Sequence, residues 1–308
     1  MKYCFGVDIG GTTVKMGLFA ENGDIRDKWE IVTKTEDEGK AILPDVAAAI
    51  SGKMEEHHLT KEDIKGIGVP APVTSEGVVN GSANLGWKYK EAKKELEELT
   101  GMKATFGNDA NVAALGEMWK GGGAGCKNLV MVTLGTGVGG GVIVGGKIVV
   151  GQFAGGEIGH MCVNYHETKQ CGCGSYGCLE QYASATGIVR LATEKLESET
   201  RSTLLKKEEL SAKAVFDAVK EGDEVATEIA TEMGEYLGHA LANIAAVLDP
   251  AIFVIGGGVS KAGDVLLPFI EKPFKDRAFF ASQNVKFALA TLGNDAGICG
   301  AAKMVLED

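Results

Sequence analysis

The chain has 308 residues, of which 45% are hydrophobic and 24% charged, the composition of a folded globular protein large enough for two domains. Its 31 basic and 42 acidic residues give a formal net charge of −11, which argues against a nucleic-acid partner, for which a basic surface is expected. We find no apolar run of about eighteen residues and no leader-like N-terminus, so we expect a cytoplasmic protein without a membrane span. Four of the seven cysteines stand singly, as thiols in a reducing compartment do.

The N-terminal region reads as strand, glycine turn, strand, hairpin and strand. Apolar runs predict a strand over residues 2–7, a second one ending at Phe19, and a third over 25–33. Asn22-Gly23 lies between the last two and is a strong signal for a tight hairpin.

The sequence DIGGTTVK, residues 8–15, lies between the first two of these strands. Its glycines and hydroxyl side chains predict a turn whose backbone N–H groups are suited to surround a phosphate. A plain glycine hairpin explains the same residues equally well, so this short motif by itself does not decide between them.

Helices and strands then alternate. Apolar residues near a 3.6-residue period predict a helix over 41–58, and an apolar run predicts a strand over 64–69. A loop rich in proline and glycine, which contains Asn84, leads to a charged amphipathic helix over 88–100 and a strand over 102–106.

Two polar residues, Asn108 and Asp109, follow this strand and open the next helix in the sequence GNDANVAALGE. Side chains at such a junction between a strand and a helix project into an interdomain cleft, where a substrate binds. The alternative for Asp109 is a purely structural role as the N-cap of the helix.

Residues 128–150 repeat the opening pattern of the chain, with GTGVGGG in place of the first glycine turn. Gly10 corresponds to Gly135, an offset of 125 residues. Such a repeat predicts two duplicated α/β domains. Their two glycine turns would face each other across a cleft, and each would present N–H groups to a polyphosphate.

Four metal-ligand residues are concentrated between Glu157 and Glu180. We expect one structural, tetrahedral Zn²⁺ site with all four positions filled by the protein, from the ligands His160, Cys171, Cys173 and Cys178. Unpaired cysteines in a glycine-rich loop, or a disulfide, are the alternatives. Glu157 and Glu180 lie just outside the two ends of this metal loop, so a bound zinc would also fix these two carboxylates.

The region after the metal loop is mainly helical. A helix is predicted over 181–197, a charged exposed connection over 199–213 and a long helix over 223–248, which Asp249-Pro250 ends. An apolar strand over 251–255 follows.

A third glycine turn, GGGVS at residues 256–260, comes directly after that strand and opens another helix. It is suited to the close approach of a flat ring or a phosphate, although a simple tight turn is the alternative. The last helix, over 295–305, consists of small residues and is expected to return to the first domain.

These features together indicate phosphate transfer to a polyhydroxylated acceptor. Carboxylates and amides accept or bridge several hydroxyls, whereas a phosphate or carboxylate substrate would require arginine or lysine. Such a reaction needs positioning and one general base.

The chain resembles the ROK family of bacterial sugar kinases and repressors in the successive motifs DIGGTTVK, GNDANVAALGE, LGTGVGGG, GGEIGH, CGCGSYGCLE and VIGGGVS. The resemblance implies an α/β fold of the actin-like ATPase type, in which two ribonuclease-H-like domains enclose an interdomain cleft and a structural zinc loop belongs to the second. We expect residues 1–112 with 295–308 to form the small N-terminal domain, and 113–294, with the zinc loop at 157–180, to form the large one.

The resemblance also implies roles for individual residues. Asp109 matches the catalytic base that takes the proton of the sugar 6-hydroxyl, and His160 would both ligate zinc and face the sugar. The positions that match the sugar site are Asn84, Asn108, Asp109, Glu157, His160 and Glu180. Asp8 matches the carboxylate near Mg²⁺. The remaining positions that match ATP contacts are Gly10, Gly11, Thr12, Thr13, Lys15, Gly135, Thr136, Gly137, Gly256, Gly257 and Gly258.

The activity that follows is an ATP-dependent hexose kinase, with glucose as the expected sugar and glucose 6-phosphate as the product. A kinase for N-acetylmannosamine, N-acetylglucosamine or fructose stays open, because Ala71 in Val69-Pro70-Ala71-Pro72 departs from the Pro-Gly-Pro of the family. A non-catalytic sugar-sensing regulator is the third alternative. Asp109 argues against it, and Asp8 comes too early to leave room for the helix-turn-helix that the repressors carry before this region. We expect a homo-oligomer, a dimer or a tetramer, that binds a small sugar and ATP and neither nucleic acid nor membrane.

Overall fold

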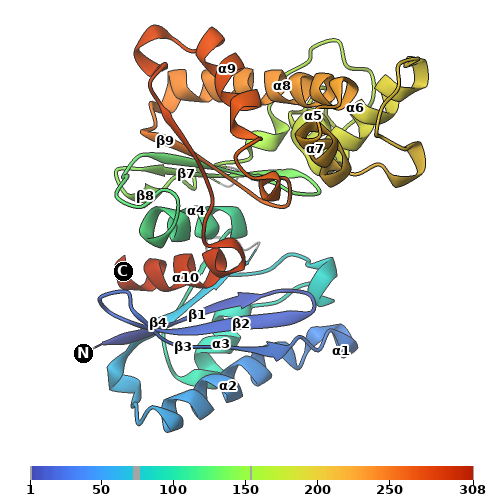
Figure 1. Cartoon of the computed structure of the whole chain (residues 1–308). Helices are drawn as coiled ribbons and strands as arrows, with labels where there is room; N and C mark the ends of the chain where they lie inside the picture. Colours follow the sequence, from blue (N-terminus) through green and yellow to red (C-terminus); the bar gives the residue numbers. More distant parts are fainter. Residues whose placement is uncertain (1, 72–76, 153–154, 308) are drawn as a thin grey trace. The chain divides into compact units, whose positions relative to one another are not determined.

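The computed structural model describes residues 2–71, 77–152 and 155–307. They divide into two compact units, the first formed by Met1–Ala124 with Asn294–Asp308 and the second by Gly125–Gly293 (Figure 1). The first unit therefore contains the whole segment 113–124, which the sequence suggested for the other domain. We describe each unit by itself.

The first unit is built on a five-stranded sheet in the order β3-β2-β1-β4-β5. The antiparallel neighbours β1, β2 and β3 come from the predicted hairpin region, and β4 and β5 run parallel to β1. The strands span β1 Tyr3–Ile9, β2 Thr13–Ala20, β3 Ile25–Val32, β4 Ile64–Pro70 and β5 Ala104–Gly107.

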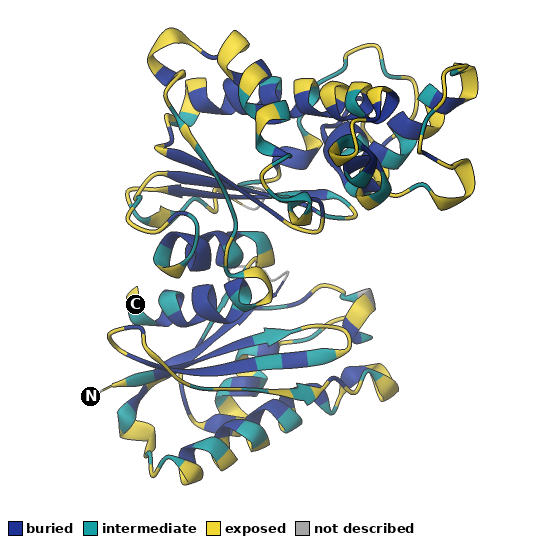
Figure 2. Ribbon diagram, in the orientation of Figure 1, coloured by how far each residue is buried: buried dark blue, intermediate teal, exposed yellow. Residues whose placement is uncertain are grey.

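Helices cover both faces of this sheet, with α2 and α3 on one face and α10 on the other, and α4 packs on α10 (Figure 1). Their bounds are α1 Glu36–Gly39, α2 Ile42–Glu56, α3 Ala92–Thr100, α4 Asp109–Lys120 and α10 Ala296–Glu307, with 3-10 turns at Lys61–Asp63 and Ala83–Leu85. In Figure 2, α2 is buried on one face and exposed on the other, whereas α4 and α10 are buried or intermediate over nearly their whole length.

The last helix returns to the first unit, as the sequence predicted, because its small residues allow very close packing. A Cβ atom at Gly6 of β1 would overlap the carbonyl oxygen of Ile298, and one at Gly68 of β4 would overlap that of Ala301. On its other side, a Cβ atom at Gly300 of α10 would overlap the carbonyl oxygen of Val112 in α4.

The second unit has a five-stranded sheet in the order β10-β9-β6-β7-β8, which is the topology of the first sheet. The strands β6, β7 and β8 take the places of β1, β2 and β3, and β9 and β10 take those of β4 and β5. Their bounds are β6 Leu129–Leu134, β7 Val138–Val144, β8 Lys147–Ile148, β9 Ile252–Gly256 and β10 Lys286–Leu289. The predicted duplication is thereby confirmed.

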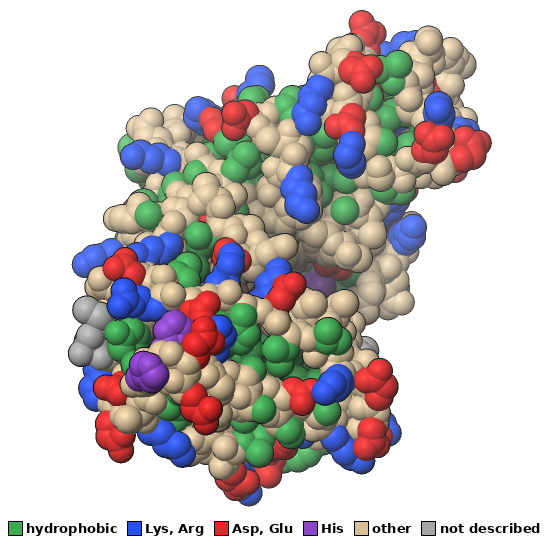
Figure 3. Space-filling model, turned by 60° about the horizontal axis from the view of Figure 1, so that its bottom comes forward, with side chains coloured by type: hydrophobic (Ala, Val, Ile, Leu, Met, Phe, Trp, Pro, Cys, Tyr) green, Lys and Arg blue, Asp and Glu red, His purple; other side chains and the backbone are tan. Residues whose placement is uncertain are grey.

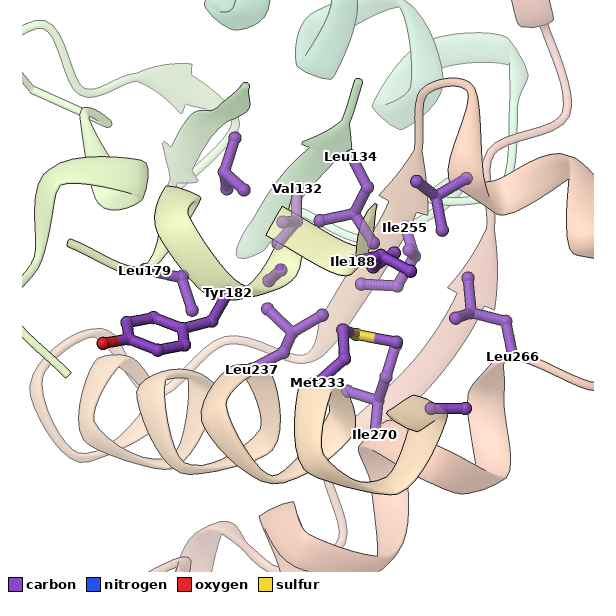
Figure 4. Packing of buried hydrophobic residues seen from close by; sticks show 14 of the residues in the cluster. Val132, Leu134, Leu179, Tyr182, Ile188, Met233, Leu237, Ile255, Leu266 and Ile270 are labelled. Atoms are coloured by element: carbon purple, nitrogen blue, oxygen red, sulfur yellow. The ribbon is translucent and has the colours of Figure 1, made fainter. Parts of the chain in front are cut away.

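A large apolar core lies between this sheet and the helices of the second unit (Figure 4). Leu134 of β6 and Ile255 of β9 point toward Met233 and Leu237, and Ile188 lies between them. The helices are α5 Glu180–Ala183, α6 Ala185–Ser198, α7 Ala212–Lys220, α8 Glu224–Leu248 and α9 Leu267–Arg277, with 3-10 turns at Ile158–His160, Lys207–Glu209, Val259–Ala262 and Phe280–Ser282. A further 3-10 turn, Gly293–Asp295, lies where the chain leaves this unit for the first.

Three predicted helical segments differ from the structure. The helix predicted from residue 88 begins at Ala92, because Trp87 and Lys90 form bridges with Ser82 and Val79 instead. The helix predicted over 181–197 is interrupted at Ser184, whose extended backbone and side-chain hydrogen bond to the N–H of Gly187 start α6 afresh. The charged connection predicted over 199–213 ends two residues early, because α7 begins at Ala212.

One predicted turn also differs. Part of GTGVGGG is strand, because Gly139, Gly140 and Gly141 pair with β6.

No helix among the described residues is long and apolar enough to span a membrane. Acidic and basic side chains are interspersed over the face shown in Figure 3.

Candidate active site

The junction between β5 and α4 presents Asp109 in the first unit. Asn108 is the N-cap of α4, since its Oδ1 accepts hydrogen bonds from the N–H groups of Ala110 at 3.0 Å and Asn111 at 3.4 Å. The capping role that was the alternative for Asp109 therefore belongs to its neighbour. Asp109 is the first residue of the helix and its side chain is exposed.

The pKa of Asp109 is raised from its ordinary value to about 6. Desolvation by the surrounding protein is the main cause and the negative charge of Asp8 is the second. The side chain is open to solvent over part of its surface, but both causes act in the same direction. A carboxylate with this pKa is a better proton acceptor near neutral pH than an ordinary aspartate.

Asp8 lies near the end of β1, opposite Lys15 of β2 in the antiparallel register. Burial raises the pKa of its carboxyl group, and the Lys15 charge opposes that shift. Its Cγ would lie 2.7 Å from a Cβ atom at Gly297, so α10 approaches Asp8 closely. Because burial disfavours the charged form of this carboxylate, a divalent cation that neutralises the charge would bind there favourably.

The first glycine turn follows directly. Gly10 donates its N–H to the carbonyl oxygen of Thr13 at 3.0 Å, and Thr33 braces the turn with a 2.6 Å hydrogen bond from its hydroxyl to the carbonyl of Gly10. A Cβ atom at Gly11 would lie 3.0 Å from the carbonyl oxygen of Asn84. The structure thus brings Asn84, a predicted sugar contact, against the predicted phosphate turn.

The loop in which Ala71 departs from the family pattern runs beside Asn108. The N–H of Ala71 donates to the carbonyl of Gly107 at 2.8 Å, and the Ala71 side chain is buried. Ala71 is not among the residues with positive φ, so an alanine fits this backbone without strain. Pro72, the last residue of that motif, lies outside the described residues.

The second unit contains the corresponding turn at Gly135–Gly137. Gly135 donates its N–H to the carbonyl of Gly137 at 2.9 Å, in the manner of Gly10. The start of α6 braces it, since Ala185 donates its N–H to the carbonyl of Gly135 at 2.7 Å and Thr186 its hydroxyl to that of Thr136 at 2.8 Å.

Glu180 connects this turn to the metal loop. Its Oε2 accepts the N–H of Val138 at 3.0 Å, and a Cβ atom at Gly137 would overlap that oxygen. Its Oε1 lies 3.9 Å from the Sγ of Cys171. Residue 137 must therefore be glycine for the carboxylate to reach this position.

The four predicted zinc ligands come together in the second unit. One ligand atom each of His160, Cys171, Cys173 and Cys178 lies within 4.8 Å of the other three. The Sγ atoms of Cys173 and Cys178 are 3.6 Å apart, close to the separation of about 3.8 Å that two thiolates have on a tetrahedral zinc. All seven cysteines are free, so the disulfide alternative is not found.

The donor set and spacing of these residues fit a structural zinc ion. Burial and the neighbouring thiols raise the pKa of Cys178 to about 12, whereas hydrogen bonds, first that of the Ser175 backbone, lower the pKa of Cys173. A thiol that holds its proton this firmly is unfavourable as a ligand until a cation displaces the proton.

Glu157 directly precedes the 3-10 turn Ile158–His160, and His160 is the last residue of that turn. Both side chains are exposed. The turn lies directly on β7, because a Cβ atom at Gly159 would overlap the carbonyl oxygen of Val138. His160 therefore lies beside the second glycine turn as well as beside the three cysteines.

The third glycine turn packs on the end of β6. Gly257 has φ +85°, and a Cβ atom there would lie 2.5 Å from the carbonyl oxygen of Leu134, directly before the second turn. A cavity of about 280 Å³ adjoins this turn. It is lined by Gly258, Val259, Lys261 and Ala262 and, from α7, by Ala212, Lys213, Phe216, Asp217 and Lys220.

A larger cavity of about 520 Å³ lies between α8 and α9 in the same unit, and none of the predicted site residues lines it. The candidate base Asp109 and the metal ligands line neither this cavity nor the smaller one beside Gly258.

Two bracing residues, Thr33 and Thr186, were missed from the sequence. Each is a hydroxyl residue close to a strand or helix end, which is a weak signal because such residues also serve as ordinary caps. Their hydrogen bonds join segments that are far apart in the chain, such as Thr186 with Thr136.

The chain matches one protein family and a named relative over nearly its whole length. The family model described as the ROK family matches residues 4–308. A protein named glucokinase from Halalkalibacterium halodurans is 45% identical over 315 residues, covering 99% of this chain and 96% of that protein.

Two solved structures show the same architecture. A ROK family glucokinase from Streptomyces griseus, in complex with glucose and AMPPNP, matches with a TM-score of 0.75 and 33% identity over 99% of this chain and 100% of that one. A ROK hexokinase from Thermus thermophilus matches with a TM-score of 0.83 and 29% identity over 97% and 96%.

Proposed function

Since this chain belongs to the ROK family, we propose that it is an ATP-dependent glucokinase that converts glucose to glucose 6-phosphate. The observation that carries this proposal is Asp109, a carboxylate with a pKa of about 6. Its side chain is not needed as the cap of α4, because Asn108 caps that helix. The glucokinase relative that is 45% identical over 99% of the chain supports glucose as the sugar.

In the proposed reaction the oxygen of the sugar 6-hydroxyl attacks the γ-phosphorus of ATP. The bond between this phosphorus and the oxygen that bridges it to the β-phosphate breaks, ADP leaves, and Asp109 takes the hydroxyl proton. Because Asp109 is exposed and ionised at neutral pH, it is able to receive that proton directly.

The proposed sugar contacts come from both units. Asn84 and Asn108 belong to the first, and Glu157, His160 and Glu180 to the second. All five offer the carbonyl, carboxylate or ring nitrogen atoms that suit hydroxyl groups. The position of Glu180 beside Gly137 supports a role between the sugar and the phosphates.

The proposed nucleotide contacts are the three glycine turns with Asp8, Thr12, Thr13, Lys15 and Thr136. The cavity beside Gly258 is the proposed place of the base, with Phe216 and Val259 as apolar walls. Mg²⁺ bound near Asp8 would neutralise the phosphate charge, and zinc in the metal loop would keep Glu180 and His160 in place.

A kinase for an N-acetylhexosamine or fructose is the second candidate. The observation that favours it is Ala71, which places a buried methyl group next to Gly107 where the family has a glycine, a change that would alter the fit of the sugar. We also propose that the protein assembles as a homodimer or homotetramer, which measurement of its mass in solution would test.

The test is ADP release with Mg²⁺ and ATP in the presence of glucose, mannose, fructose, allose, N-acetylglucosamine or N-acetylmannosamine, with a control that lacks sugar. We expect glucose to give the highest kcat/KM. A preference for another sugar would change the proposed substrate and leave the proposed mechanism unchanged. No turnover with any sugar would contradict the kinase proposal.

A further inference from the structure

The part of the metal loop between Met161 and Cys178 has few apolar side chains that anchor it to the rest of the unit. Its residues 164–176 are mostly exposed, and even Tyr165 and Tyr176 are open to solvent, with exposed fractions of 86% and 49%. Two isolated bridges, Cys162 with Cys178 and Gln170 with Tyr176, are its regular backbone pairings. Polar contacts must therefore supply much of the order that hydrophobic packing gives elsewhere.

One side chain in the middle of the loop, Glu167, is held unusually firmly. Its carboxylate accepts a 2.5 Å hydrogen bond from the hydroxyl of Tyr182 and a 2.8 Å ion-pair contact from Nη1 of Arg190. It also accepts the N–H groups of Thr168 at 3.0 Å and Lys169 at 2.9 Å. These donors, first of all Tyr182, lower the pKa of Glu167 to about 2, so the carboxylate is ionised at neutral pH.

The partners of Glu167 belong to helices that pack in the core of the second unit. Tyr182 lies in α5 and stacks on Tyr236 of α8, with ring centroids 3.9 Å apart. Figure 4 shows its ring beside Leu179 at the edge of the buried cluster, with the hydroxyl pointing out of that cluster. Arg190 lies in α6, with its guanidinium 4.7 Å from the centre of the Tyr182 ring.

The same network reaches the metal ligands and the candidate sugar carboxylate. Gln181 donates from Nε2 to the carbonyl of Lys169 at 2.9 Å, and its Oε1 accepts the N–H of Cys178 at 3.0 Å. Glu180, Gln181 and Tyr182 are consecutive residues of α5. Glu167 is therefore connected through short contacts to a metal ligand and to the helix that carries Glu180.

We propose that Glu167, Tyr182 and Arg190 are positioning residues that attach the metal loop to α5 and α6. The contacts described above join them to neither a metal ligand nor a candidate sugar-binding residue, and they act by holding His160, Cys178 and Glu180 in place. The consequence for sugar binding rests on the proposed function, whereas the consequence for zinc retention does not.

The test uses the full chain with zinc bound. The variants Tyr182→Phe, which removes one hydroxyl, and Glu167→Gln, which removes the charge, are compared with wild type. The rate of zinc release to a chelating dye is measured together with the KM values for glucose and ATP and the midpoint of unfolding.

The chain offers a closely matched control in Glu199→Gln. Glu199 also pairs with an arginine, Arg201, and accepts two backbone N–H groups, those of Thr200 and Arg201. Its pKa is likewise lowered to about 2 and its side chain is 8% exposed, against 12% for Glu167. It lies at the other end of α6, so it shares the stabilising role without the contact to the loop.

We expect zinc release from the two test variants to be faster by roughly 10- to 100-fold, with a higher KM for glucose and an unchanged KM for ATP. Glu199→Gln is expected to lower the unfolding midpoint and to change neither zinc release nor the glucose KM. Zinc release equal to that of the control, or a wild-type protein that holds no zinc, would overturn the proposal. If wild type phosphorylates no glucose, the proposed function fails and zinc release alone decides on the positioning residues.

Discussion

At the scale of the residue, the candidate site depends on the division of roles between Asn108 and Asp109. The cap satisfies the free N–H groups of α4 with the amide of Asn108, so the neighbouring carboxylate is not needed for helix stability. A structural side chain and the candidate base thereby share one helix terminus.

The first prediction concerns the general base. Asp109→Asn keeps the shape of the side chain but cannot accept the hydroxyl proton, so kcat should fall by roughly 10²- to 10⁴-fold. The KM for glucose should change little. Asp45→Asn, which removes another acidic group from the first unit, is the control and should retain normal turnover. Near-normal turnover by Asp109→Asn would exclude the role of base.

The second prediction concerns pH. Asp109 must be ionised to act, and its pKa is raised to about 6, so kcat/KM should be constant above this value and decline as the pH falls through it. An ordinary aspartate would keep its activity to much lower pH. A profile that stays flat to about pH 4.5 would contradict the assignment.

The same pKa shift has a consequence for stability. A raised pKa means that the folded protein binds the proton more tightly than the unfolded chain does, so ionised Asp109 disfavours folding at neutral pH. Asp109→Asn should therefore be no less stable than wild type at pH 7, when unfolding is followed with denaturant. A clear loss of stability would show that the carboxylate has a structural role.

At the scale of the element, glycines decide which helices and strands meet. Gly300 of α10 lies against the Val112 carbonyl of α4, where no Cβ atom has room. Gly300→Ala should destabilise the first unit by about 1–3 kcal/mol, measured by denaturant unfolding, because the two helices must move apart.

Gly52 of α2 is the matched control for this prediction. A Cβ atom there meets nothing within 4 Å, so Gly52→Ala should raise stability by up to about 1 kcal/mol through helix propensity. Equal effects of the two substitutions would refute the close packing of α10 on α4.

The next prediction concerns the metal loop as an element. Protein purified without added zinc should contain about one zinc per chain, and removal by a chelator should weaken glucose binding before the first unit unfolds. Metal analysis and a calorimetric glucose titration measure the two effects. Active protein without zinc would contradict the structural role of His160 and the three cysteines.

At the scale of the whole molecule, a duplicated fold explains why corresponding glycine turns recur 125 residues apart. Each unit supplies one turn at the end of its central strand, and each turn is closed by the same kind of backbone hydrogen bond, at 3.0 Å for Gly10 and 2.9 Å for Gly135. The second unit adds the metal loop and the third glycine turn to this common plan.

Local patterns in the sequence determined the strands of both sheets except β10, the long helix α8, the glycine turns and the cluster of His160 with three cysteines. They suffice there because hydrophobic period, glycine runs and the spacing of cysteines are properties of neighbouring residues. The starts of α3 and α6 were less well predicted, because the bridge of Lys90 with Val79 and the cap at Ser184 compete with helix propensity.

The tertiary structure alone decided what each polar side chain contacts. The hydrogen bond from Val138 to Glu180 joins residues 42 positions apart, and the ion pair of Glu167 with Arg190 joins the metal loop to α6. The tertiary structure also raises the pKa of Asp109, through desolvation and through the charge of Asp8. Asp8 lies about a hundred residues before Asp109 in the chain. Such contacts depend on distances in space, which the order of residues does not contain until the chain has folded.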